Sequence, residues 1–230
     1  MAGLGMAGPV TVLLVDDHAV VREGYRRLLE RQGDIAVIGE AADAAAAYRL
    51  FRERSPQIVV MDITLPGVSG IEAMRRMLVH QPELRVLIFS MHEDLIFARR
   101  ALQAGAWGYV TKASAPDVLV QAVHALAGGR RYISPPLAEE LALHGEALQV
   151  GAAHALSARE FEVLRLLVHG KGVREIAGTL GLTPKTVANH QSSIKQKLGA
   201  DTALQLLRAA ARLGLTADCP WPPQRLERAD

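Results

Sequence analysis

Hydrophobic and polar positions in the first 128 residues alternate between two patterns. Short unbroken apolar runs are typical of buried strands, and longer stretches with apolar residues every three or four positions are typical of amphipathic helices. The strand-like runs are 10–15, 35–39, 57–61, 85–90 and 107–110. The helical stretches lie near 19–32, 43–54, 70–80, 93–104 and 115–127. This alternation predicts a doubly wound α/β fold with a five-stranded parallel sheet, of the flavodoxin-like kind.

The rest of the chain follows other patterns. Glycines and prolines in residues 129–153 indicate an interdomain linker, although a helix beginning around Pro136 fits part of it. Residues 154–215 are apolar only at helical spacing and predict a small all-α domain. The last 15 residues, 216–230, carry three prolines and predict a largely disordered tail. We therefore expect the α/β domain to span residues 10–128.

Charge is distributed unevenly between these parts. Residues 1–128 hold 13 Lys and Arg against 14 Asp and Glu, whereas residues 154–215 hold 9 against 4. A near-neutral domain joined to a small basic one favours a polyanion partner for the second domain. A basic helical surface without such a partner is the alternative that composition leaves open.

Composition favours a cytoplasmic protein that does not enter a membrane. The longest run without Asp, Glu, Lys or Arg is residues 1–15, which is shorter than the roughly 18 residues that a membrane span needs. Cys219 is the only cysteine, so it forms no internal disulfide, and a reducing compartment is the simplest expectation.

Charged and hydroxyl side chains follow the predicted strands at their carboxyl ends. Asp16 and Asp17 follow the first strand, Asp62 the third and Lys112 the fifth, while Ser90 ends the fourth. Because the carboxyl ends of parallel strands share one edge of the sheet, we expect these groups to converge. Carboxylates in such a cluster suit Mg²⁺, and a carboxylate beside a metal and a cation can act as a phosphoryl acceptor. The sequence thus predicts Asp62 as a nucleophile.

Each of these residues also has an ordinary interpretation. Asp17 can cap the helix that starts near Ala19, and a single lysine after a strand is usually solvated. A phosphatase of the haloacid-dehalogenase kind is the rival chemistry, but it needs a second aspartate at the position of Thr64. The sequence also lacks the glycine-rich phosphate loop of nucleotide hydrolases.

A helix-turn-helix is predicted within the all-α domain. Thr183 suits a helix N-cap, Pro184 the first turn and Gly199 the stop, and a shorter helix ending near Gly181 precedes them. The second helix of such a motif can enter the DNA major groove. Its candidate DNA contacts are Lys185, Thr186, Ala188, Asn189, Ser192, Ser193, Lys195 and Lys197. A solvated helix face is the alternative interpretation of these residues.

Four segments of the first domain resemble the signature segments of the response-regulator receiver domain. They are "LLVDDH", "VVMDITLPGVSG", "VLIFS" and "GAWGYVTKAS". The resemblance implies that Asp62 accepts a phosphoryl group from a histidine kinase. It also implies that Mg²⁺ is bound by Asp17, Asp62 and the backbone carbonyl of Thr64, with Asp16 acting through water.

The same resemblance assigns the residues that respond to phosphorylation. Ser90 and Tyr109 would form the switch pair, with Tyr109 following Ser90 inward, and Lys112 would be the counter-charge of the phosphate. His18, next to the acidic pair, is expected only at the start of a helix.

Residues 156–215 resemble the LuxR-type DNA-binding domain, with "EIA" and "TPKTVANH" among the matching segments. The chain departs from the family pattern at Gly172, Val173 and Arg174, so the target DNA sequence is left open. The two resemblances together indicate a NarL/FixJ-type response regulator, which is a DNA-binding transcription regulator and not an enzyme.

Two questions about assembly stay open. The resemblance implies a homodimer that forms on phosphorylation and binds promoter DNA. A helical stripe of Leu204, Leu207, Ala211 and Leu215 fits either a dimer surface or packing against the helix near 158–169. The alternative function is a constitutive DNA binder whose receiver is only a dimerisation scaffold.

Overall fold

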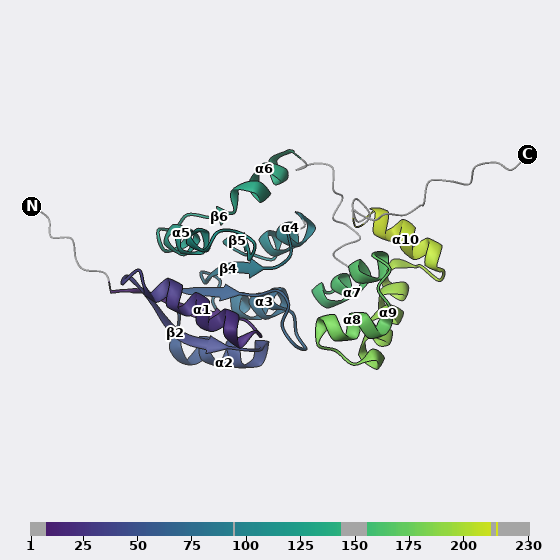
Figure 1. Ribbon diagram of the computed structural model, residues 1–230, viewed down its shortest axis with the longest axis horizontal. Helices are drawn as coiled ribbons and strands as arrows, with labels where there is room; N and C mark the ends of the chain where they lie inside the picture. Colours follow the sequence, from purple (N-terminus) through teal and green to yellow (C-terminus); the bar gives the residue numbers. More distant parts are fainter. Residues whose placement is uncertain (1–7, 94, 144–155, 213–214, 216–230) are drawn as a thin grey trace, which may run out of the picture. The chain divides into compact units, whose positions relative to one another are not determined.

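The computed structural model describes residues 8–93, 95–143, 156–212 and 215. The chain divides into two compact units, residues 1–145 and 146–230, which are described separately (Figure 1). The expected tail and the end of the expected linker lie outside the described residues. Within the described part, no helix is both long and apolar enough to cross a bilayer.

Unit 1 is a parallel sheet covered by helices. Its strands are β1 (Val10–Val15), β2 (Ile35–Ala41), β3 (Ile58–Met61), β4 (Arg85–Ser90), β5 (Gly108–Thr111) and β6 (Tyr132–Ile133). Its helices are α1 (Ala19–Glu30), α2 (Ala44–Arg54), α3 (Gly70–His80), α4 (Leu95–Gln103), α5 (Pro116–Ala127) and α6 (Pro135–Leu143). All neighbouring strands run parallel in the order β2-β1-β3-β4-β5-β6. The doubly wound fold is confirmed.

The sheet has six strands, and our expectation of five was wrong by one. Tyr132 and Ile133 pair with Gly108 and Tyr109 of β5. A Cβ atom on Gly108 would lie 2.5 Å from the Tyr132 carbonyl oxygen, so this pairing needs a glycine. A two-residue strand has too few positions to show a period of two, so β6 lies unforeseen inside the segment expected to be a linker. The helix that fits this segment from around Pro136 is present as α6.

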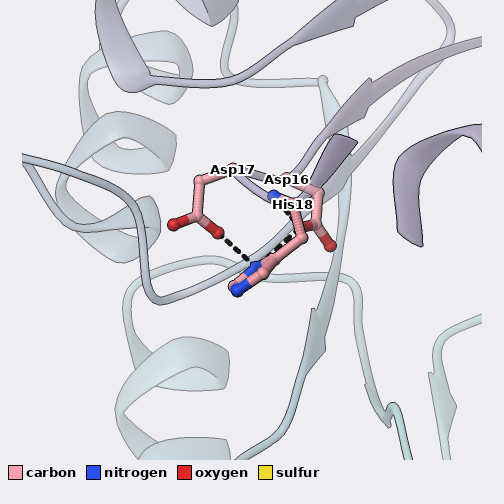
Figure 2. A group of neighbouring side chains, drawn as sticks. All are labelled: Asp16, Asp17 and His18. Carbon is pink, nitrogen blue, oxygen red and sulfur yellow. Dashed lines mark hydrogen bonds and ion pairs between the residues drawn. The ribbon is translucent and has the colours of Figure 1, made fainter. Parts of the chain in front are cut away.

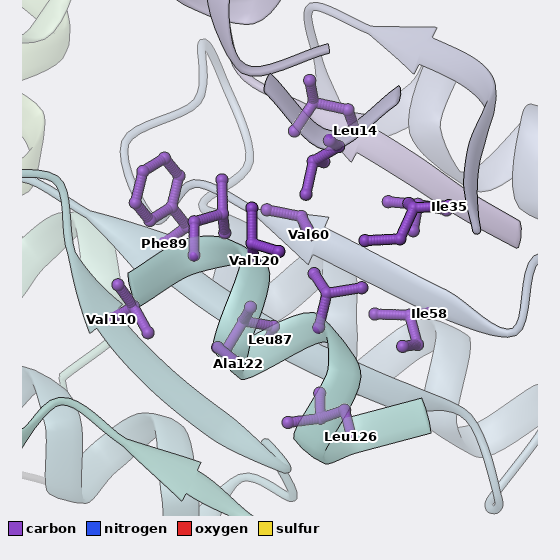
Figure 3. Close-up of a cluster of buried hydrophobic side chains, with 14 residues drawn as sticks. Leu14, Ile35, Ile58, Val60, Leu87, Phe89, Val110, Val120, Ala122 and Leu126 are labelled. Atoms are coloured by element: carbon purple, nitrogen blue, oxygen red, sulfur yellow. The ribbon is translucent and has the colours of Figure 1, made fainter. Parts of the chain in front are cut away.

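A continuous apolar core lies between the sheet and helices α1 and α5 (Figure 3). Figure 3 shows Leu14, Val60, Leu87, Phe89 and Val110 of the sheet in one cluster with Val120, Ala122 and Leu126 of α5. Phe89 also makes an edge-to-face contact with Tyr25 of α1, with 4.6 Å between ring centroids. Burying each such side chain contributes about 1.5–3 kcal/mol, which makes the sheet a rigid base for the residues at its edge.

Unit 2 consists of helices α7 (Ala158–Val168), α8 (Val173–Leu180), α9 (Pro184–Leu198) and α10 (Ala203–Arg212). Gly181 ends α8 and Gly199 ends α9, both in the left-handed conformation that a glycine adopts without strain. The Thr183 hydroxyl accepts a hydrogen bond from the Thr186 amide at 3.1 Å and caps α9. The predicted helix-turn-helix is therefore present as α8, a short turn and α9.

The stripe on α10 divides between two environments. Leu215 is buried, Leu207 is half-buried, and Leu204 and Ala211 are exposed, with 59% of Leu204 accessible. α10 also packs against α7 and α9. Leu215 follows the end of α10 at Arg212 and is buried, so it is not part of an exposed stripe, and a dimer role for Leu204 and Ala211 stays a prediction.

Candidate functional site

The carboxyl ends of β1, β3, β4 and β5 are joined by backbone hydrogen bonds that continue just beyond the strands. The Asp62 amide donates to the Val15 carbonyl at 2.9 Å, and the Lys112 amide donates to the Ser90 carbonyl at 2.7 Å. The order of the strands reverses between β1 and β3, which is where ligands bind in sheets of this kind. These hydrogen bonds therefore fix the backbone positions from which the side chains of the site extend.

Lys112 bridges two of the buried aspartates. Its Nζ lies 2.6 Å from Asp16 Oδ2 and 2.5 Å from Asp62 Oδ2, and all three side chains are buried. This contact brings together residues from β1, β3 and β5 that are far apart in the sequence. The predicted convergence of carboxylates and lysine is found in the structure, whereas their chemical roles remain proposals.

Gly70, the first residue of α3, lies against the backbone of Asp62. A Cβ atom at this position would approach the Asp62 carbonyl oxygen to 1.8 Å, which no side chain tolerates. The Gly70 amide donates to the Ile63 carbonyl at 2.8 Å and closes the loop. The glycine thus lets the β3–α3 loop return beneath the candidate nucleophile.

Burial and charge act in opposite directions on this cluster. Burial raises the pKa of Asp62 above its ordinary value, and Lys112 only partly offsets that rise. For Lys112, burial acts to lower the pKa, but the carboxylates of Asp62 and Asp16 outweigh it and raise the pKa overall. Lys112 is therefore held as a cation between the two carboxylates.

Asp17 and His18 are more exposed than Asp16, and the three side chains lie next to one another (Figure 2). The His18 Nδ1 atom is 2.7 Å from Asp17 Oδ1 and 3.5 Å from Asp16 Oδ1. One ligand atom from each of the three residues lies within 4.8 Å of the others. We expected His18 only at a helix start, and the structure also places its ring against the acidic pair.

The donor set fits a small divalent cation. The formal charges of Asp16, Asp17, Asp62 and Lys112 sum to −2 beside oxygen ligands, which Mg²⁺ prefers. Thr64 follows in the same loop, and its amide donates to Asp62 Oδ1 at 3.2 Å.

Ser90 and Tyr109 meet through the backbone of His92. The Ser90 hydroxyl accepts a hydrogen bond from the His92 amide at 3.3 Å, and the Tyr109 hydroxyl donates to the His92 carbonyl at 2.7 Å. Tyr109 is fully buried. We expected Tyr109 to move inward on phosphorylation, but in this structure it already lies inside.

His92 was missed in the sequence analysis. Its ring stacks on Phe97 at 4.1 Å between centroids, and its Nε2 atom lies 3.1 Å from the Thr64 hydroxyl. The signal available was its position two residues after Ser90, in a loop at the carboxyl edge of the sheet. Because periodicity does not describe loops, the sequence pattern predicts no role for His92.

One face of α9 is exposed and polar. Lys185, Ala188, Asn189, Ser192 and Lys195 are all exposed. Lys185, Asn189 and Ser192 lie on the side of the helix opposite to its buried residues, Val187 and Ile194, and Ala188 and Lys195 lie beside them on one flank. This face has the position and chemistry that a recognition helix needs.

The other three candidate DNA contacts have partners inside unit 2. The Thr186 hydroxyl lies 2.8 Å from the Thr183 hydroxyl. The Ser193 hydroxyl donates to Glu160 Oε1 at 2.5 Å, and Lys197 Nζ lies 2.7 Å from Glu160 Oε2. The helical pattern placed Ser193 and Lys197 outside the core but gave no sign of a carboxylate on α7.

Comparisons with known families agree with both units. Residues 12–124 match the response regulator receiver domain, and residues 154–210 match the bacterial regulatory proteins of the luxR family. A receiver joined to such a helix-turn-helix defines a response regulator that controls transcription. The chain belongs to the NarL/FixJ (LuxR) family of two-component response regulators.

Individual relatives cover nearly the whole chain. Response regulator GacA of Pseudomonas syringae pv. syringae (strain B728a) is 37% identical over 208 residues, covering 90% of this chain and 97% of GacA. A LuxR-family response regulator from Aurantimonas sp. SI85-9A1 has 54% identity and a TM-score of 0.59, covering 60% of this chain and 99% of that one. RcsB from Salmonella enterica serovar Typhimurium, bound to promoter rprA with the phosphomimetic BeF3−, has 27% identity and a TM-score of 0.58, covering 89% and 99%.

Proposed function

We propose that Asp62 is the phosphoryl acceptor and that its phosphorylation by a histidine kinase controls DNA binding by α9. The observation that carries this proposal is the Lys112 bridge between Asp16 and Asp62. A buried lysine between two carboxylates supplies a positive charge at the point where a phosphoryl group would arrive. The cytoplasm, where kinase domain and DNA are both accessible, is the proposed location.

In the proposed transfer, an oxygen of the Asp62 carboxylate forms a new P–O bond while the P–N bond to the kinase histidine breaks. The imidazole leaving group takes up a proton. Lys112 pairs with the phosphoryl oxygens, and the Ser90 hydroxyl donates a hydrogen bond to one of them. The chain itself contributes an acceptor and positioning groups, which agrees with a regulator rather than an enzyme.

Mg²⁺ is the proposed cofactor of this step. Asp17, Asp62 and the Thr64 backbone carbonyl would bind it, and Asp16 would act through water. When bound, the cation neutralises negative charge on the phosphoryl oxygens and on the carboxylates. The oxygen donors and the formal charge of −2 support this assignment.

The proposed DNA-contacting surface is the exposed face of α9. Lys185 and Lys195 would neutralise phosphates, and Asn189 would read a base edge, because an amide can make a bidentate contact to adenine. Ala188 and Ser192 lie between them and would approach the groove. The Ser192 hydroxyl donates only to a backbone carbonyl of its own helix, that of Ala188 at 3.1 Å. Since Thr186, Ser193 and Lys197 contact side chains of other residues in unit 2, we leave these three out of this surface.

Dimerisation is the proposed link between the two events. Phosphorylation would favour a homodimer, and two recognition helices would then bind two half-sites of promoter DNA related by two-fold symmetry. The exposed Leu204 and Ala211 on α10 are the proposed contacts between protomers.

The acceptor assignment is tested by intact-mass analysis after incubation with acetyl phosphate and Mg²⁺. The wild-type chain should gain an acid-labile phosphoryl group, and Asp62→Ala should not. Asp34→Ala is the matched control, because Asp34 is an exposed carboxylate that precedes β2 at the opposite edge of the sheet. A full phosphate adduct on Asp62→Ala would overturn the assignment.

A further inference from the structure

Glu160 on α7 connects two elements of unit 2 through a single buried carboxylate. At the start of its own helix, Glu160 Oε2 accepts a hydrogen bond from the Ser157 amide at 2.6 Å and completes a capping box. Across the unit, its two oxygens accept from the Ser193 hydroxyl at 2.5 Å and from Lys197 Nζ at 2.7 Å. One side chain thus fixes the N-terminus of α7 and the C-terminal half of α9.

The lysines of α9 differ in what surrounds them. Lys197 is 39% exposed, and its charge is paired with the nearly buried Glu160. Lys185 and Lys195 are exposed, and among the described residues neither has an ion-pair partner. Lys195 and Lys197 are two residues apart, so they point about 160° apart around the helix. Lys197 therefore lies on the flank that faces α7, away from the exposed face of α9.

We propose that Glu160 is a specificity-determining residue that positions α9 and keeps Lys197 away from the DNA backbone. This inference rests on the proposed function of α9 in DNA binding. Each lysine that neutralises a phosphate adds affinity for any sequence, because it releases a counterion whatever the bases are. By pairing with Lys197, Glu160 limits this sequence-independent affinity, and by holding Ser193 it fixes the helix that reads the bases.

Glutamine at position 160 would separate charge from geometry. In Glu160→Gln, the remaining side-chain oxygen can accept from the Ser157 amide and the new NH₂ group can donate to the Ser193 hydroxyl, but the charge that holds Lys197 is removed. Lys197 is then free to reach a phosphate. We expect the affinity of this variant for scrambled DNA to rise. Its preference for the duplex that the phosphorylated wild type selects from random sequences should fall.

The experiment measures DNA affinity of the full chain against salt concentration, on the selected duplex and on a scrambled one. The variants are Lys195→Met, Lys197→Met, Glu160→Gln and the double variant of Glu160→Gln with Lys197→Met. The salt slope is the magnitude of the fall in log affinity per unit of log salt concentration, and each phosphate contact contributes about 0.9 to it. One contact therefore accounts for a roughly 3-fold loss of affinity between roughly 50 and 200 mM salt. Circular dichroism checks that each variant keeps its helices.

Lys195→Met should lower the slope by about 0.9, and Lys197→Met should leave it unchanged. Glu160→Gln should raise the slope by about 0.9, and the double variant should return it to the wild-type value. A fall in the slope of Lys197→Met equal to that of Lys195→Met would overturn the inference while DNA binding by α9 stands; this comparison does not need Glu160→Gln to fold. A slope that neither lysine variant changes would overturn the proposed α9 surface, and the inference with it.

Discussion

The Tyr109 hydroxyl donates a hydrogen bond of 2.7 Å to the backbone carbonyl of His92. This bond ties β5 to the loop after β4, and the same stretch of loop is bound by Ser90 through the His92 amide. A change at Ser90 therefore reaches Tyr109 through one residue of backbone. The backbone of His92 thus links the two proposed switch residues.

Removing this hydroxyl should loosen the loop without removing the ring. Tyr109→Phe removes the buried hydrogen bond to the His92 carbonyl, and we expect the free energy of unfolding to fall by about 0.5–1.5 kcal/mol. Urea unfolding measures this change. Tyr132→Phe is the matched control, since its hydroxyl makes only a 3.4 Å contact at an exposed position, and it should cost less than about 0.5 kcal/mol. Equal losses in the two variants would contradict the role of the Tyr109–His92 bond.

Ser90 should be needed for the response to phosphorylation but not for the transfer itself. Ser90→Ala retains Asp62 and Lys112, so we expect it to accept phosphate from acetyl phosphate while losing most of the phosphate-induced gain in dimerisation. Intact mass and sedimentation velocity measure the two properties separately. Ser90→Thr keeps the hydroxyl and should respond like the wild type. If Ser90→Ala dimerises as fully as the wild type, Ser90 is not the switch.

Gly70 should tolerate no side chain. In Gly70→Ala, the new methyl group overlaps the Asp62 carbonyl oxygen, and we expect the free energy of unfolding to fall by about 1–3 kcal/mol together with slower phosphate uptake. Gly24→Ala on α1 is the control, because nothing lies within 4 Å of its Cβ position. There alanine should stabilise the helix by about 0.5–1 kcal/mol. A Gly70→Ala variant as stable as Gly24→Ala would refute the proposed close approach of the loop to Asp62.

Much of this architecture could be predicted from the sequence, because long buried strands and amphipathic helices leave strong periodic patterns. The five longer strands and the residues at their carboxyl ends follow from such patterns. β6 could not be predicted, since it has two residues and depends on the absence of a side chain at Gly108. His92 and the partner of Lys197 were missed for another reason: contacts across a loop or between helices depend on tertiary packing, which periodicity does not encode.

Glu160 should make the stability of unit 2 depend on pH. Burial acts to raise the pKa of Glu160, but hydrogen bonds from Lys197, Ser193 and Ser157 outweigh it and lower the pKa from 4.5 to about 2. Because the folded-state pKa is depressed, the carboxylate stabilises the folded state above about pH 4.5, and this stabilisation is lost as the pH falls toward about 2.

The test measures the difference in unfolding free energy between the wild type and Glu160→Gln, with circular dichroism as the probe of unfolding. We expect the wild type to be the more stable at neutral pH and the difference to shrink as the pH falls through this window. Glu175→Gln, on the exposed surface of α8, is the control and should show a smaller difference throughout. A difference that does not depend on pH would mean that the charge of Glu160 is unimportant for stability.

The central claim is that phosphorylation of Asp62 controls DNA binding. The most direct measurement is the DNA affinity of the full chain, with and without acetyl phosphate and Mg²⁺, on a duplex selected from random sequences by the phosphorylated protein. The wild type should bind that duplex more tightly when the phosphodonor is present, and Asp62→Ala should bind it weakly in both conditions. Equally tight binding by the wild type and Asp62→Ala, with no effect of the phosphodonor, would contradict this account and favour a constitutive DNA binder with a receiver that serves only as a scaffold.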